Sequence, residues 1–223
     1  LVSFKNFIKD YYDQFKRPTL DEYLIPGNNT IAAKIQTIPY VFMIGTLWKH
    51  QNCIEGTNIF RKAFIEDCRV SKCNFEGGFF ASTVHPQFEE FKDFIFKKRY
   101  PVIKYIAKTK LSTFVFNTPA VWECHGWKLG EYLAMGKAII SMPIRNNLPE
   151  ELVHGKNIHF ISSTDELKLA IDLLLKDDNY RKVLENGAKA YYINHVDPHA
   201  VIKEIINSEI NIKLNQNLTL MYV

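Results

Sequence analysis

One stretch, residues 114–142, constrains the fold of this chain more than any other, and it reads FVFNTPAVWECHGWKLGEYLAMGKAIISM. Its apolar run at 114–116 ends in Asn-Thr-Pro, which is typical of a strand that leaves a sheet. Residues 127–135 carry apolar side chains at helical spacing and are followed by a glycine that favours a helix end. Apolar residues return at 138–140. This order predicts a loop at the ligand-binding edge of an open α/β sheet.

Several polar side chains fall close together at the predicted start of the helix. Glu123 and Glu131 are separated by seven residues, and Lys128 shares a helix face with Glu131. His125 and Gly126 lie at the helix N-terminus, where free backbone N–H groups favour a phosphate and a glycine allows close approach. A cation, two carboxylates, an imidazole and a helix N-terminus together suit a sugar linked to a nucleotide diphosphate.

The stretch resembles the C-terminal, donor-binding domain of retaining glycosyltransferases with the two-domain GT-B architecture, and within them a bacterial subgroup of the group 1 enzymes. The family carries a Glu-x7-Glu motif that runs into a helix, and then the segment Ala-x-Gly-Lys-Pro-Val-Ile. Glu123 and Glu131 match the two glutamates, and Gly126 matches the glycine between them. The residues AMGKAII at 134–140 match the family's Ala-x-Gly-Lys segment, except that Ala138 replaces the usual proline.

A second motif of the same family lies downstream. Pro149-Glu150 and, after four more residues, Gly155 match the family's Pro-Glu-x4-Gly pattern. Strands and helices alternate over residues 39–208, as expected for a parallel sheet covered on both faces. The resemblance implies an α/β, Rossmann-like domain with a parallel sheet and helices on both faces, which is one half of a GT-B architecture.

The resemblance also implies an activity: transfer of a sugar from a UDP- or GDP-linked donor to a hydroxyl acceptor, with retention at the anomeric carbon. In the family the second glutamate holds the ribose hydroxyls and the first lies near the transferred sugar, so these roles fall on Glu131 and Glu123. Lys128 is our candidate for the phosphates, since a cation and a helix N-terminus stabilise a leaving diphosphate. No metal or other cofactor is expected, and the sequence contains no Asp-x-Asp motif.

The first strand of the domain is predicted at 40–44, and it ends in Gly45-Thr46. In the family this glycine loop lies near the donor phosphates, and an arginine often comes directly after the glycine. Thr46 takes the arginine's place here. Either Lys49 or Arg61 could supply the missing charge, and the sequence does not choose between them.

Ten residues are predicted to form the site. In the family, the backbone of the loop before the Pro-Glu motif touches the donor and is rich in glycine, whereas this chain has asparagines there, which tolerate left-handed backbone. The predicted catalytic residues are Glu123, His125 and Lys128. The predicted donor-binding residues are Gly45, Thr46, Arg61, Gly126, Glu131, Asn147 and Leu148. A surface salt bridge between Lys128 and Glu131, and a structural role for His125, are the competing interpretations.

Two predictions concern glycines elsewhere. Residues 74–80 predict a strand in which Gly77-Gly78 indicates a bulge or a close backbone approach. The chain lacks the G-x-G-x-x-G spacing at this point, which disfavours a nicotinamide dehydrogenase. A helix is predicted at 177–192, with an interruption at Gly187.

The chain has 223 residues and divides into an N-terminal helical arm and linker at 1–38, the nucleotide-sugar-binding domain at 39–208 and a tail at 209–223. The arm carries apolar residues at helical spacing over 2–15. A GT-B enzyme has two Rossmann-like domains and this chain has room for one, so we expect the N-terminal acceptor domain of the same protein to be missing.

Composition limits the partners. The net charge of +4 is mild and scattered, which gives no argument for nucleic acid. The chain has no apolar run of about 20 residues, no charged-then-apolar pattern of a signal peptide opens it, and its four cysteines lack C-x-x-C spacing. We expect a cytoplasmic protein with a glycan or lipid-linked acceptor, and peripheral contact with the inner face of the membrane is an open alternative.

Two other functions stay open. A donor domain alone could be a non-catalytic nucleotide- or sugar-binding module. A sugar-nucleotide epimerase-like enzyme could act through the same pocket, and an assay of donor hydrolysis against donor isomerisation separates it from the transferase.

Overall fold

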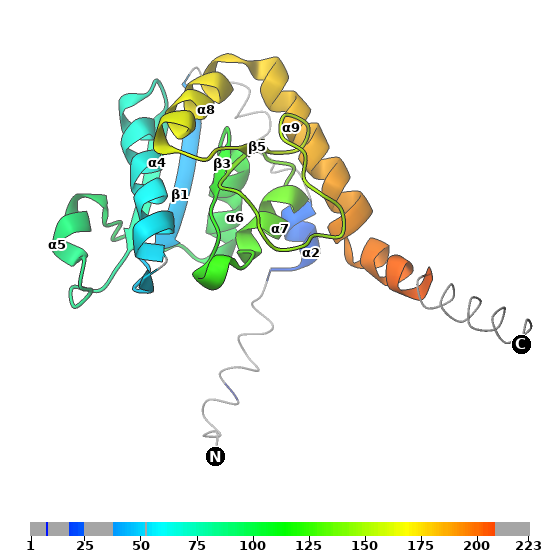
Figure 1. Ribbon diagram of the computed structural model, residues 1–223, viewed down its shortest axis with the longest axis horizontal. Helices are drawn as coiled ribbons and strands as arrows, with labels where there is room; N and C mark the ends of the chain where they lie inside the picture. Colours follow the sequence, from blue (N-terminus) through cyan, green and yellow to red (C-terminus); the bar gives the residue numbers. More distant parts are fainter. Residues whose placement is uncertain (1–7, 9–17, 25–37, 52, 208–223) are drawn as a thin grey trace, which may run out of the picture.

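The structure is a computed structural model that describes residues 8, 18–24, 38–51 and 53–207. Within this part, parallel strands form two sheets that lie side by side, and helices cover both faces (Figure 1). The strands are β1 (Tyr40–Thr46), β2 (Asn74–Phe80), β3 (Val115–Asn117), β4 (Ile139–Ser141) and β5 (His159–Phe160). The α/β, Rossmann-like prediction is therefore confirmed.

The strands run in the order β2-β1 and β3-β4-β5, and β3 lies beside β1. The two groups meet where the N–H of Thr113 donates to the carbonyl of Tyr40 at 2.7 Å. From β1 the chain moves outward to β2, then returns to the other side of β1 and continues from β3 to β5. The direction of strand addition therefore reverses between β1 and β3.

Helices of about two to four turns connect the strands, and shorter segments complete the fold. The longer helices are α4 (Ile59–Val70), α6 (Val102–Leu111), α7 (Trp127–Ala134), α8 (Thr164–Lys176) and α9 (Asp178–Tyr191). The shorter α-helices are α2 (Leu20–Leu24) and α5 (Phe88–Phe91). The other helical turns are Cys53–Asn58, Lys92–Phe94, Val121–Glu123 and Tyr192–Val196, and another helix spans 198–207.

Side chains alternate between the two faces of the sheet, as a pleated strand requires. Val41 and Met43 pack into the core under α4 and α8, whereas Phe42 and Ile44 pack on the other face, towards α6. On the α4 side the ring of Phe64 stacks on Phe116 with centroids 4.9 Å apart. This two-sided burial holds β1 rigidly and fixes the point at which it ends.

The glycines of β2 confirm the predicted close approach. A Cβ at Gly77 would lie 1.7 Å from the carbonyl oxygen of Met43, and a Cβ at Gly78 would lie 2.3 Å from that of Phe94. The prediction for Gly187 is wrong, because α9 runs through it without interruption. A Cβ at Gly187 would lie 2.0 Å from the carbonyl oxygen of Lys156, so this glycine lets the helix pack against a loop.

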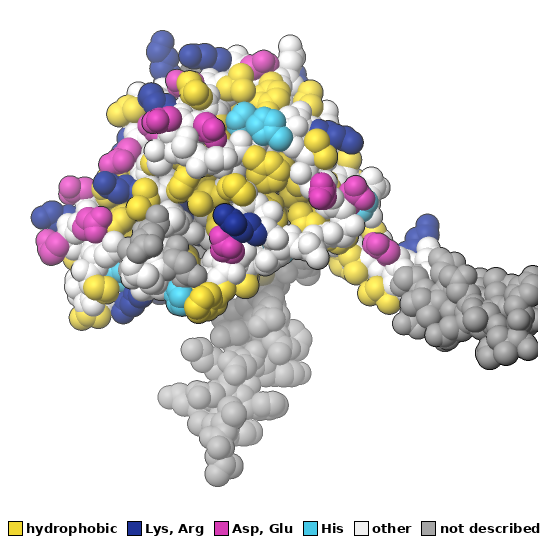
Figure 2. Space-filling view, viewed as in Figure 1, with side chains coloured by type: hydrophobic (Ala, Val, Ile, Leu, Met, Phe, Trp, Pro, Cys, Tyr) yellow, Lys and Arg dark blue, Asp and Glu magenta, His cyan; other side chains and the backbone are white. Residues whose placement is uncertain are grey.

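The domain boundaries stay predictions. The helical pattern at 2–15 and the tail at 209–223 fall outside the described residues, apart from Ile8. No helix in the described part of the chain is both long and apolar enough to cross a membrane. On the face shown in Figure 2, basic and acidic side chains are interspersed around an apolar area.

Candidate functional site

The candidate site lies where β1 and β3 end. In open parallel sheets, ligands bind beyond the carboxyl ends of the strands at the point where the strand order reverses. Gly45 and Thr46 close β1 at this point, and Thr118 comes directly after β3. The sequence therefore brings the predicted glycine loop to the position where the topology favours a ligand.

Arg61 spans this gap from the first turn of α4. Its Nη1 donates to the carbonyl of Thr46 at 3.1 Å, and its Nε and Nη2 donate to Oγ1 of Thr118 at 2.9 and 2.7 Å. A Cβ at Gly45 would come within 3.2 Å of Nη1, so the glycine makes room for the guanidinium. Burial lowers the pKa of Arg61 to about 10, and the group therefore stays charged at neutral pH.

Lys128 reaches the same gap from the first turn of α7. Its ammonium donates to the carbonyl of Ile44 and lies 5.9 Å from the centre of the Tyr105 ring. Burial, with a further contribution from the charge of Arg61, lowers the pKa of Lys128 to about 7, although Glu131 acts in the opposite direction. Arg61, which is charged at neutral pH, and Lys128, which is partly charged there, thus converge on the strand ends.

Neither cation forms an ion pair with a carboxylate that the structure describes. Among those residues, no carboxylate oxygen lies within 4.0 Å of the charged nitrogens of Arg61 or Lys128. The competing interpretation of a surface salt bridge between Lys128 and Glu131 therefore has no support in the geometry. Two neighbouring like charges at a ligand edge favour a bound anion, which would stabilise both charged forms.

Glu131 lies one turn further along α7, and two phenols hold its carboxylate. Tyr23 on α2 donates to Oε1 at 3.2 Å, and Tyr105 on α6 donates to Oε2 at 3.3 Å. Burial raises the pKa of Glu131, while the two hydrogen bonds and Lys128 partly offset this effect. The sequence analysis missed both tyrosines, because each lies far from Glu131 along the chain and only folding brings them together.

The remaining predicted residues lie mostly in two exposed loops that contact each other. Glu123, with φ of 56°, forms an ion pair with Nε of Arg145 at 3.0 Å, and its carbonyl accepts from the Asn146 amide at 3.4 Å. The exposed ring of His125 places Nε2 3.4 Å from the carbonyl oxygen of Asn147. These contacts join the loop after β3 to the loop after β4.

The predicted residues therefore fall into two groups. Five form the cation and carboxylate cluster, namely Gly45, Thr46, Arg61, Lys128 and Glu131. Glu123, His125 and Asn147 lie in the exposed loops, and Leu148 packs partly against the core beneath α7. Gly126 caps α7 and connects the two groups, and a Cβ there would lie 3.7 Å from the Thr118 carbonyl oxygen. Lys49 is exposed in the loop after β1, so of the two open choices the structure brings Arg61 to the glycine loop.

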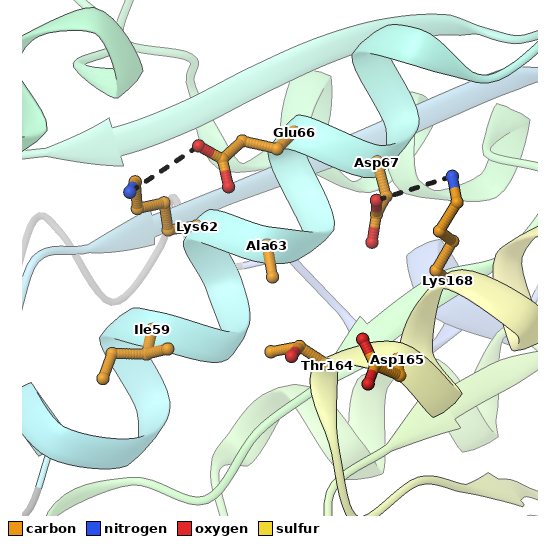
Figure 3. A pocket seen from close by; sticks show the side chains of 8 residues that line it. All are labelled: Ile59, Lys62, Ala63, Glu66, Asp67, Thr164, Asp165 and Lys168. Atoms are coloured by element: carbon orange, nitrogen blue, oxygen red, sulfur yellow. Dashed lines mark ion pairs between the residues drawn. The ribbon is translucent and has the colours of Figure 1, made fainter.

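A separate hollow of about 340 Å³ lies between α4 and α8 (Figure 3). Its lysines are already paired, Lys62 with Glu66 at 3.6 Å and Lys168 with Asp67 at 3.9 Å. It shares no residue with the strand ends, and we assign it no function. The full lining is Ile59, Lys62, Ala63, Glu66, Asp67, Thr164, Asp165 and Lys168. The described residues contain no group of three or more potential metal ligands.

Solved structures with the same fold include glycosyltransferase domains. The C-terminal domain of a glycosyl transferase group 1 family protein (LpcC) from Francisella tularensis matches with a TM-score of 0.56 and 14% identity, over 80% of this chain and 97% of that one. TarM matches with a TM-score of 0.54 and 12% identity, over 77% of this chain and 35% of that one. A glycosyltransferase from Rickettsia africae matches with a TM-score of 0.57 and 16% identity, over 88% of this chain and 55% of that one.

At these identities the likeness establishes the fold, which is that of the Rossmann-like C-terminal domains of GT-B glycosyltransferases. The chain spans nearly all of the isolated LpcC domain but only about a third to a half of the other two chains. No protein-family model and no curated protein matches the sequence.

Proposed function

We propose that this chain is the donor-binding part of a glycosyltransferase, which transfers a sugar from a UDP- or GDP-linked donor to a hydroxyl acceptor with retention and without a metal. The observation that carries the proposal is the convergence of Arg61 and Lys128, neither paired with a described carboxylate, at the reversal point between β1 and β3. The fold shared with glycosyltransferase domains supports the same assignment.

In this proposal each group of the donor meets a matching group of the chain. The diphosphate binds Arg61 and Lys128 near the N-terminus of α7, where the cations stabilise the charge that develops as it leaves. Glu131 accepts hydrogen bonds from the ribose hydroxyls. Glu123 and His125 lie on the more exposed side, next to the transferred sugar and the acceptor.

The acceptor in this proposal is a glycan or lipid-linked hydroxyl, and the reaction takes place in the cytoplasm or at the inner face of the membrane. Two of the similar structures are much longer than this chain, so transfer is proposed for a protein in which another domain supplies the acceptor site. A second candidate is a nucleotide-binding module without turnover, because the same cations at the strand ends would hold a nucleotide whether or not a sugar is transferred. An assay of the donor separates the two functions. A transferase transfers the sugar or releases it from the donor, whereas a module without turnover does neither.

The proposal is tested by calorimetric titration of UDP and GDP, in the absence of metal, into the chain and its variants. We expect one nucleotide to bind, and Arg61→Ala, Lys128→Ala and Glu131→Ala each to weaken binding roughly tenfold or more, because each removes a hydrogen bond to or from a charged group. Lys49→Ala is the matched control, since Lys49 is exposed in the loop after β1. Failure of both nucleotides to bind, or equal losses in all variants, would reject the donor site.

A further inference from the structure

Tyr23 brings the short helix α2 into the candidate site. Its hydroxyl donates to Oε1 of Glu131 at 3.2 Å, across a separation of 108 residues in the chain. Burial and the charge of Glu131 raise the pKa of Tyr23 to about 12, so the phenol stays protonated and acts as a donor at neutral pH. Glu131 is the residue to which the proposed function assigns the ribose hydroxyls.

Both oxygens of the Glu131 carboxylate already accept a hydrogen bond from a phenol, which leaves one of the two acceptor positions on each oxygen for a ligand. A ribose diol would present one hydroxyl donor to each oxygen of a carboxylate. Here Tyr23 already donates to one oxygen and Tyr105 to the other. A ribose that uses both oxygens must therefore share each of them with a phenol, and we expect it to compete with the phenol that is held less firmly.

The two phenols differ in how firmly they are held. Tyr105 belongs to α6, a ten-residue helix that packs directly on β1. Tyr23 belongs to α2, which has five residues and none that is fully buried. Helices of this length are not stable alone, so α2 depends on its contacts with the domain.

The contacts described for α2 bury little of it. Besides the Tyr23 hydrogen bond, the Lys110 ammonium donates to the carbonyl of Glu22, and Tyr23 and Leu24 pack partly against the core near α7. Segments with little buried apolar surface open at the lowest free energy in a protein. The helix also carries Asp21 and Glu22 and no basic residue, so it has the same sign of charge as a nucleotide.

We propose that α2 is a displaceable strap whose Tyr23 hydroxyl occupies the ribose position on Glu131, so that nucleotide binding requires this hydrogen bond to be exchanged for the ribose hydroxyls. Tyr105 stays in place and orients the carboxylate. The inference rests on the proposed function, because it gives Glu131 a ligand for which Tyr23 competes. It adds a means by which the N-terminal segment regulates donor binding.

The first test compares nucleotide affinity in the full chain and in Tyr23→Phe. Removal of the competing hydroxyl is expected to tighten the binding of UDP or GDP roughly fivefold, the value of one hydrogen bond. Tyr180→Phe is the matched control, because it removes a partly buried phenol whose partner is Nδ1 of His159, at 2.8 Å, rather than Glu131. Thermal unfolding of both variants checks that each remains folded.

The second measurement is amide hydrogen exchange of residues 20–24 with and without the nucleotide. Displacement of the strap predicts faster exchange in the complex. Slower exchange of residues 20–24 in the complex would overturn the inference. So would a nucleotide affinity of Tyr23→Phe that is equal to or below that of the parent chain. In either case α2 would be a fixed part of the site.

Failure of the inference can be distinguished from failure of the proposed function. If the nucleotide binds and needs Arg61 and Lys128, but Tyr23→Phe has no effect, the donor site stands and the strap is rejected. If neither the parent chain nor Tyr23→Phe binds a nucleotide, the donor site is rejected and the strap with it.

Discussion

Arg61 and Thr118 join the two sides of the gap between β1 and β3, because Nε and Nη2 of the arginine both donate to the threonine hydroxyl, at 2.9 and 2.7 Å. Thr118 is 6% exposed, so this bond is shielded from water. A guanidinium with two donors fixed on one oxygen has a defined orientation. This contact explains how Arg61, which belongs to α4, places its positive charge at the end of β1. Thr46 stands there at the position where the resembling family often has an arginine.

Replacement of Thr118 tests this contact. Thr118→Val keeps the shape but leaves two guanidinium donors without their acceptor, so the free energy of unfolding should fall by about 1–3 kcal/mol. Thr118→Ser retains the hydroxyl and should lose less than the valine variant. Urea unfolding of the three chains measures the difference. Equal stabilities for the valine and serine variants would mean that the hydroxyl does not hold Arg61.

Local sequence patterns predicted the elements around the site well. The strand, loop, helix and strand of residues 114–142 are present, and α7 (Trp127–Ala134) ends one residue before the predicted end. These predictions succeeded because apolar periodicity and a glycine stop act within a few residues. The strand predicted at 40–44 is longer, since β1 continues to Thr46 and pairs with β2 along its whole length.

The hydrogen-bond partners of the site could not be predicted in the same way. Tyr23 and Glu131 are 108 residues apart, and Arg61 and Thr118 are 57 apart. Nothing in a single sequence links positions at such distances, because the link is made by the strand order. The choice between Lys49 and Arg61 likewise required the path of α4 beside β1, which periodicity alone does not define.

The low pKa of Lys128 should make nucleotide binding depend on pH. Burial and Arg61 lower this pKa to about 7 in the free protein, so the ammonium is lost as the pH rises above that value. An anion raises the pKa, and binding should therefore take up a proton and weaken as the pH rises from about 7 to 9. The terminal phosphate of the nucleotide is already ionised between pH 7 and 9, so its own titration does not explain a change of affinity in this range.

Calorimetry in buffers of different ionisation enthalpy measures this proton uptake directly. Lys128→Met should bind more weakly and show no such uptake, whereas Lys49→Met should behave as the parent chain. Affinity in the parent chain that is constant from pH 7 to 9 would contradict a charged Lys128 on the ligand.

The carboxylate of Glu76 should contribute to stability in a pH-dependent way. Burial alone would raise its pKa, but hydrogen bonds from Lys108 at 2.6 Å, from Tyr100 and from Tyr40 at 2.7 Å lower it to about 2. The pKa in the folded state is thus below the usual 4.5, so the contribution is present above that value and is lost as the pH falls towards 2.

Glu76→Gln should therefore destabilise the fold by about 1–3 kcal/mol at pH 7 and by clearly less at pH 3. Urea unfolding at the two pH values measures the change. Glu89→Gln is the control, because Glu89 pairs with Lys92 at 3.4 Å on the exposed surface and should lose at most about 0.5 kcal/mol. A loss for Glu76→Gln that is the same at both pH values would show that the charge of Glu76 does not matter.

Two helical glycines should respond to alanine with opposite signs. A Cβ at Gly187 would lie 2.0 Å from the carbonyl oxygen of Lys156, whereas nothing lies within 4 Å of a Cβ at Gly130. Gly187→Ala must push α9 from the loop at Lys156, which should cost about 1–3 kcal/mol of stability. Gly130→Ala only removes the entropic disadvantage of glycine in a helix and should stabilise by about 0.5–1 kcal/mol. Urea unfolding of both variants decides the question, and a stabilising Gly187→Ala would mean that α9 does not pack against this loop.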